Sequence, residues 1–136
     1  MFAISTAYRR RGGAMIEFAL SFLFFLALVF SIVELGRGAW AYGTIAHATR
    51  QGARFAQIRG TISPATAAQV EAVVASHITG LDTTGLTVTT TWEPAIERGG
   101  IVQVRSRYVF PFWLPSLVVE NSSVTLGATS RMIVAN

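Results

Sequence analysis

The chain of 136 residues contains no cysteine and few charged side chains, which make up 13% of the sequence. Without cysteine, neither a disulfide framework nor a thiolate metal site can form. The two histidines, His47 and His77, have no carboxylates at ligand spacing beside them. No nucleophile elbow or metal-binding helix motif accompanies the scattered acids of the C-terminal half. We therefore expect no catalytic residue, no metal and no cofactor, and an anchored enzyme is the most remote alternative.

Lysine is also absent, and the net charge of +4 comes from eleven arginines against seven acidic residues. Three of these arginines are consecutive, Arg9 to Arg11; without them eight arginines face seven acids, which leaves +1. The basic character therefore belongs largely to the N-terminus and does not predict nucleic-acid binding. Hydrophobic residues make up 51% of the chain, a balance typical of a small membrane-anchored protein.

A long apolar run follows the arginines. From Phe18 to Val33 every residue is apolar except Ser21 and Ser31. As a helix, the window Ala14 to Leu35 spans roughly 33 Å, enough to cross a hydrocarbon core of about 30 Å. Positive residues before the first span place the N-terminus in the cytoplasm and the rest of the chain outside.

Three interpretations of this run remain open: an uncleaved anchor, a secretory signal peptide, and a leader that resembles those of type IV prepilins. A signal peptidase could cut at Ala39-Trp40-Ala41, but the run is long and polar residues separate it from that position. In the prepilin-like interpretation the chain is cut between Gly12 and Gly13. That cut places Glu17 at the fifth position of the mature chain.

Glu17 needs a reason to be where it is, because a carboxylate inside an apolar helix costs about 2.5–3.5 kcal/mol on insertion scales. One interpretation is subunit docking, in which Glu17 pairs with the new α-amino group of a neighbouring chain. The alternative is a side chain that extends to the cytoplasmic interface, which its position near the helix start permits.

The helix is expected to continue beyond the membrane, from Ala14 to about Arg59, over roughly 69 Å. Glu34 and Arg37 lie three residues apart and can pair on one face. Trp40 follows as an interfacial aromatic residue. Apolar and small residues then recur at spacings of three and four: Ile45, Ala48, Gly52 and Phe55. Arg50 and Arg54 fall on the other side, as a solvated face or as specific contacts.

These residues carry a family resemblance. The segments Ile16–Leu20, Glu34–Arg37 and Ala48–Ala56 together resemble the N-terminal signature of TadE-like proteins, which are minor pilins or pseudopilins of tight-adherence pilus systems. The resemblance implies a long N-terminal helix with a small αβ head. It also implies removal of the leader by a prepilin peptidase and favours the pairing role for Glu17.

The rest of the chain predicts one helix and three strands, an α+β head. Ser63 and Pro64 begin a helix that reaches Thr79. Alternating patterns predict strands at 86–92, 101–110 and 124–134. We expect a three-stranded antiparallel sheet with the helix packed on its apolar face.

The segment Pro111–Pro115 places three large apolar side chains between two prolines, so it should leave the sheet as a loop. In one interpretation Phe112 and Trp113 fold back over the sheet and complete its core. In the other they form an exposed apolar contact for another pilin subunit or for the outer membrane leaflet. The candidate interface residues are Glu34, Arg37, Arg50, Arg54, Phe112 and Trp113.

Together these features predict three parts: a leader over 1–12, a transmembrane and extended helix over 13–59, and an extracytoplasmic head over 60–136. The predicted function is that of a minor pilin in a bacterial inner membrane, N-terminus inside, which initiates a filament or couples to the assembly platform. Its expected partners are a prepilin peptidase, other pilin or pseudopilin subunits, the inner-membrane assembly platform and the lipid bilayer. The alternative is a permanently anchored accessory protein of the secretion or pilus apparatus that never enters the filament.

Overall fold

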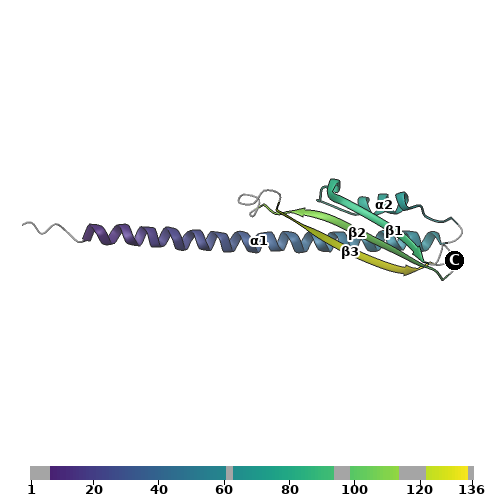
Figure 1. The fold of residues 1–136 in the computed structure, drawn as a ribbon, viewed down its shortest axis with the longest axis horizontal. Coiled ribbons are helices and arrows are strands. Elements are labelled where there is room, and N and C mark those ends of the chain that lie inside the picture. The colour runs from purple at the N-terminus through teal and green to yellow at the C-terminus, as the bar shows by residue number, and fades with distance from the viewer. Residues whose placement is uncertain (1–6, 61–62, 94–98, 114–121, 135–136) are drawn as a thin grey trace, which may run out of the picture.

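The computed structural model describes residues 7–60, 63–93, 99–113 and 122–134, with side chains from residue 12 onward. Figure 1 shows a long helix whose N-terminal part projects alone and whose C-terminal part lies against a second helix and a sheet. The elements in chain order are α1 (Ala7–Arg59), α2 (Ala67–Ser76), a 3-10 turn (Thr83–Gly85), β1 (Leu86–Glu93), β2 (Ile101–Pro111) and β3 (Ser123–Ile133). The expected α+β, pilin-like layout is therefore confirmed.

α1 begins at Ala7 and not at Ala14, so the expected start of the helix is wrong by two turns. Gly12 and Gly13 lie inside the helix. Each glycine costs about 1 kcal/mol relative to alanine in a helix. The alanine and arginines before the pair and the apolar run after it are strong helix formers, and they carry the helix across this weak point.

α2 begins at Ala67, three residues after the expected start at Pro64, and its N-cap is Thr66 and not Ser63. The Thr66 hydroxyl accepts a hydrogen bond from the backbone N–H of Gln69 at 3.3 Å, and the Gln69 side chain accepts one from the Thr66 N–H at 3.1 Å. This reciprocal capping box satisfies two N–H groups at the helix start. The sequence contains this pattern, since Gln69 follows Thr66 by three residues. The capping box sets the start of α2, which Pro64 had indicated three residues too early.

The three strands form one antiparallel sheet in the order β1-β2-β3. β2 is central, and its residues alternate strictly between buried and more exposed positions. The buried face carries every second residue of the alternating pattern: Val102, Val104, Ser106, Tyr108 and Phe110. β2 runs one residue further than expected, because Pro111 still lies opposite Ser123 of β3. A proline is tolerated at that place because the strand ends there.

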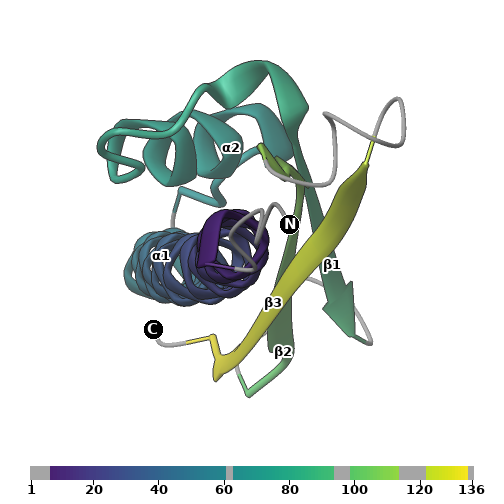
Figure 2. The ribbon, with the colours of Figure 1, turned by 90° about the vertical axis from the view of Figure 1, so that its left-hand side faces the viewer.

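The core lies between the sheet and the C-terminal half of α1. α1 contacts both β2 and β3, and α2 packs on α1 and on β1. Figure 2, which views the molecule along α1, shows α2 and the sheet on two adjacent sides of that helix. The buried residues of α1 are mostly small: Ala41, Ile45, Ala48, Thr49, Ala53 and Ala56. Residues 41–56 of α1 therefore belong to the same core as the head.

α2 approaches α1 most closely at Gly52. A Cβ atom built on Gly52 would lie 2.5 Å from Val74 Cγ2 and 3.4 Å from Val70 Cγ1. Both valines are fully buried. The missing side chain at Gly52 thus creates the space that α2 fills with Val70 and Val74.

Candidate assembly site at the membrane edge

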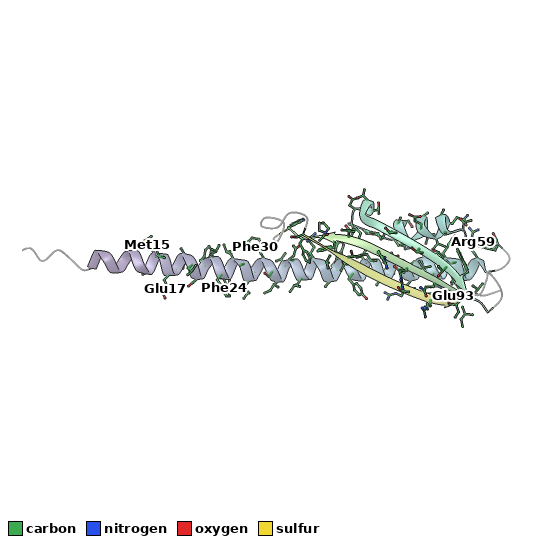
Figure 3. The ribbon with its side chains drawn as sticks, in the orientation of Figure 1. Met15, Glu17, Phe24, Phe30, Arg59 and Glu93 are labelled. Atoms are coloured by element: carbon green, nitrogen blue, oxygen red, sulfur yellow. The ribbon has the colours of Figure 1, made fainter. Side chains whose placement is uncertain are left out.

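The side chains of the N-terminal half of α1 are almost all exposed. Among the described residues, one helix, taken from Gly12 to Arg59, is long and apolar enough to cross a membrane. Every large apolar side chain between Met15 and Val33 is exposed except Leu26, which is half-buried. Figure 3 shows Met15, Phe24 and Phe30 on the part of the helix that extends beyond the head. A helix that is apolar and exposed on nearly all sides is the kind that a bilayer surrounds.

The residues of the expected cleavage site are accessible in this half. Gly12 and Gly13 are exposed, and a Cβ atom at either would meet nothing within 4 Å. Glu17 is also exposed, one turn further along α1 (Figure 3). The structure thus presents the Gly pair and the carboxylate on a free helix, and their cleavage and docking roles stay predictions.

Glu34 and Arg37 form the ion pair that their spacing predicted. Arg37 Nη2 donates to Glu34 Oε1 at 2.5 Å, and Arg37 Nε lies 3.4 Å from Glu34 Oε2. The Arg37 side chain is only 24% exposed, and the Glu34 side chain only 12%. Partial burial strengthens such a pair, because water screens the two charges less than it would on an open surface.

Arg37 also joins α1 to the end of β2, more than 70 residues away. Its Nη2 donates to the carbonyl oxygen of Pro111 at 2.5 Å. The guanidinium carbon lies 4.2 Å from the centre of the Phe110 ring and 4.5 Å from the centre of the Trp113 ring. Arginine suits this position because its plane can stack on aromatic rings while its edge donates hydrogen bonds.

Glu34 completes the connection, since its Oε1 accepts a hydrogen bond from the backbone N–H of Trp113 at 3.1 Å. We call the set Glu34, Arg37, Phe110 and Trp113, with the Pro111 carbonyl, the membrane-edge clamp. The two charges neutralise each other, and each has a second partner on the β2 end. The clamp fixes the position of that end against the helix where the apolar half of α1 stops.

Phe112 and Trp113 divide between the two interpretations of their segment. Phe112 is half-buried, packs against the core, and meets Phe110 edge-to-face with ring centres 5.6 Å apart. Trp113 is 67% exposed, so it does not complete the core. Leu114 and Pro115 lie outside the described residues. The interpretation in which both aromatic residues cover the sheet is therefore wrong for Trp113.

Arg50 and Arg54 are exposed on α1, far along the helix from the clamp. Their placement agrees with the expected polar side of the helix, and a contact role for them stays a prediction. The structure also brings together two residues that sequence reasoning left apart, His47 and His77, whose ring centres lie 6.4 Å apart. Within the described ranges, no three His, Asp or Glu side chains are placed to share a metal ion.

A buried polar contact between α1 and β2 escaped the sequence analysis as well. The Thr49 hydroxyl donates to the Ile45 carbonyl oxygen at 2.7 Å and makes a 2.8 Å hydrogen bond with the Ser106 hydroxyl. Thr49 and Ser106 are both fully buried. The alternation of β2 placed Ser106 on the inner face, but nothing in the sequence indicated which residue of α1 lies opposite.

A long apolar helix continues into a three-stranded α+β head and is joined to it by the clamp, which gives a pilin-like layout. The apolar half of this helix is long enough to anchor the protein in a membrane. The model of a family described as TadE-like protein matches residues 12–54. The resemblance expected from the sequence is confirmed over that segment, which includes Gly12, Glu17, Glu34 and Arg37. The match supports involvement in the Tad pilus system. A comparison with curated proteins and a comparison with solved structures each gave no match.

Proposed function

We propose that this protein is a minor pilin or pseudopilin that takes part in assembly of a tight-adherence pilus. The observation that carries the proposal is the TadE-like match over residues 12–54, which covers the apolar half of α1 and its continuation into the head. The continuous helix supports the proposal further, since it joins a segment suited to the bilayer with a folded head. The role is structural: to initiate a filament or to couple it to the assembly platform.

The first step in this function is removal of the leader between Gly12 and Gly13 by a prepilin peptidase. Both residues are helical in the structure, so the peptidase must unwind at least one turn of α1 before it can bind an extended strand. Two consecutive glycines make that unwinding easier, by about 1 kcal/mol each relative to alanine. The same glycines leave no side chain in the way of the enzyme.

Cleavage creates an α-amino group whose ordinary pKa is about 7.7–8.0, so it is at least partly charged at neutral pH. In a stack of subunits, Glu17 of one chain pairs with this amine on its neighbour. The pairing offsets the cost of a lone carboxylate among apolar side chains and sets the axial register between subunits. The exposed position of Glu17 on the free half of α1 supports this role.

Arg9 to Arg11 keep the N-terminus in the cytoplasm, and the head lies outside the inner membrane. The partners in this proposal are the prepilin peptidase, other pilin or pseudopilin subunits, the inner-membrane assembly platform and the lipid bilayer. The second candidate function, a permanently anchored accessory protein, has the same anchor and topology and differs in never entering a filament.

Two measurements test the proposal in cells that carry the pilus system. Intact-mass analysis of the membrane-extracted protein should show a chain that begins at Gly13, and Gly12→Asp should abolish this product. The protein should also appear in sheared pili. A full-length mass in wild-type cells would overturn the processing step. A processed chain found only in the membrane fraction would favour the accessory role.

The Glu17 step is tested separately with Glu17→Ala. The variant should be cleaved normally and fail to support pilus assembly. Glu71→Ala, which removes an exposed carboxylate on α2, is the matched control and should leave assembly unchanged. Normal piliation in the Glu17 variant would rule out the pairing role.

A further inference from the structure

We infer that the end of β2, with the adjoining Phe112 and Trp113, lies in the headgroup region of the outer leaflet, with the Trp113 indole as its lipid contact. The inference rests on the proposed function in one respect, that the apolar half of α1 crosses the membrane. It adds a second point of contact, from a part of the chain far from the span, between the head and the bilayer.

The first argument is the height of Trp113 along the span. From Met15 to Leu35, α1 rises about 30 Å, which is the thickness of a hydrocarbon core. Glu34 and Arg37 therefore lie at the outer boundary of that core. The backbone nitrogen of Trp113 is 3.1 Å from Glu34, and its ring is 4.5 Å from the Arg37 guanidinium carbon. The indole thus lies at the same height as the end of the span.

The second argument is exposure. Trp113 is 67% exposed although its backbone and one face of its ring are held by the clamp. Tryptophan prefers the membrane–water interface, because its ring is apolar while its N–H needs a polar partner. Trp40 and Tyr42, about a turn further out on α1, are 50% and 51% exposed. The three side chains form an aromatic belt drawn from two distant parts of the chain.

The third argument is the position of this end of the sheet relative to α1. In Figure 1 the β2–β3 end of the sheet is the end nearest the free half of α1, and the opposite end of the sheet lies far from it. Phe110 belongs to the core and Phe112 packs against it. Only Trp113 of these three aromatic residues is more exposed than buried. The lipid interface is therefore continuous with the surface that already surrounds α1.

Depth-dependent fluorescence quenching tests this inference with the full chain, at one chain per lipid nanodisc. Trp40→Phe combined with Trp92→Phe leaves Trp113 as the single tryptophan. Lipids brominated near the headgroup should quench its emission more strongly than lipids brominated near the chain end. The matched control keeps only Trp92, which lies half-buried at the opposite end of the sheet and should not be quenched.

A variant with Trp40 alone separates the inference from the proposed function. If Trp40 is quenched and Trp113 is not, the inference is overturned and the membrane anchor stands. If neither is quenched and the chain fails to enter the nanodisc, the anchor itself is wrong and the proposed function falls with it. If Trp113 is protected from water only in discs that hold several chains, it lies in a contact between subunits. The inference is then again overturned.

The clamp predicts one more outcome. Arg37→Gln removes the charge that pairs with Glu34 and stacks on Trp113. In the variant that keeps Trp113 alone, this change should reduce the quenching by shallow bromine, while Trp40 in its own variant keeps its quenching. Unchanged quenching of Trp113 would show that the clamp does not hold Trp113 at the lipid headgroups.

Discussion

The two halves of α1 share one continuous backbone and differ in the size of the side chains that face outward and inward. From residue 15 to residue 33 the helix carries phenylalanine, leucine, isoleucine and valine on every side, nearly all exposed. From Ala41 to Ala56 the buried side chains are mostly alanine, while exposed positions carry residues such as His47 and Arg50. Large apolar residues thus cover the half that is suited to a bilayer, and small residues mark where protein approaches closely.

The comparison is sharpest for two phenylalanines. Phe110, a member of the clamp, is 1% exposed and packs against α1, whereas Phe24 on the N-terminal half is 74% exposed. Phe110→Ala should lower the free energy of unfolding of the head by about 3–5 kcal/mol, because it leaves a cavity in the core. Phe24→Ala should leave it unchanged. Thermal unfolding of the full chain in detergent, followed by near-ultraviolet circular dichroism, measures both; equal losses would contradict the division of α1.

Two hydroxyls on α1 make the same backbone contact in the two halves. Thr49 lies 2.7 Å from the Ile45 carbonyl oxygen and Ser31 lies 2.7 Å from that of Ala27, but only Thr49 also reaches a buried partner, Ser106. Thr49→Val should destabilise the head by about 1–3 kcal/mol, since it leaves the Ser106 hydroxyl unpaired.

Ser31→Ala is the matched control and should cost the head nothing. Adding Ser106→Ala to Thr49→Val should recover part of the loss, because both partners are then apolar. Additive losses in this double-mutant cycle would show that the two hydroxyls do not interact.

Two glycines of α1 differ in their surroundings: Gly52 packs closely against α2, and Gly43 faces open space. Gly52→Ala should destabilise by up to about 2 kcal/mol: overpacking against Val74 costs about 1–3 kcal/mol, and the gain in helix propensity offsets about 1. Gly43 has nothing within 4 Å of a Cβ atom, so Gly43→Ala should stabilise by up to about 1 kcal/mol. Chemical unfolding of the two variants beside the wild type gives the difference, and the same sign for both would refute the packing argument.

The smallest effect lies in the loop between α2 and β1, away from both halves of α1. Hydrogen bonds from the backbone N–H and the hydroxyl of Thr84 hold the pKa of Asp82 below its ordinary value. A lowered pKa in the folded state stabilises the fold above the ordinary pKa, and the contribution disappears as the pH falls through the lowered value. On acidification, the melting temperature of Asp82→Asn should therefore fall slightly less than that of the wild type. Glu71→Gln is the control; an identical slope for Asp82→Asn and wild type would contradict this contribution.

Regular patterns in the sequence were sufficient for the parts of the fold that repeat. The period of two in β2 placed every second residue from Val102 to Phe110 on the buried face. The spacing of Ile45, Ala48 and Gly52 gave the buried side of α1. Boundaries were less accurate where two signals competed. At α2 the capping box of Thr66 outweighed the proline signal at Pro64.

The candidate site was only partly predictable for a different reason. The pair Glu34–Arg37 is a local contact, three residues apart on a helix, and local spacing predicts it. The contacts of Arg37 with Phe110 and Trp113 depend on how the sheet is placed along α1, which no periodicity encodes. The same holds for Thr49 and Ser106, which lie 57 positions apart in the chain.

The clamp has a mechanical consequence. α1 lies alongside β2 and β3 (Figure 1), so a pull on the N-terminal half along the helix axis loads the interface between helix and sheet in shear, with many contacts sharing the force. The clamp stands at the end of that interface where the tension enters. Because Arg37 joins the helix directly to Pro111, 74 positions later, force reaches the sheet there without first passing through the connection after Arg59.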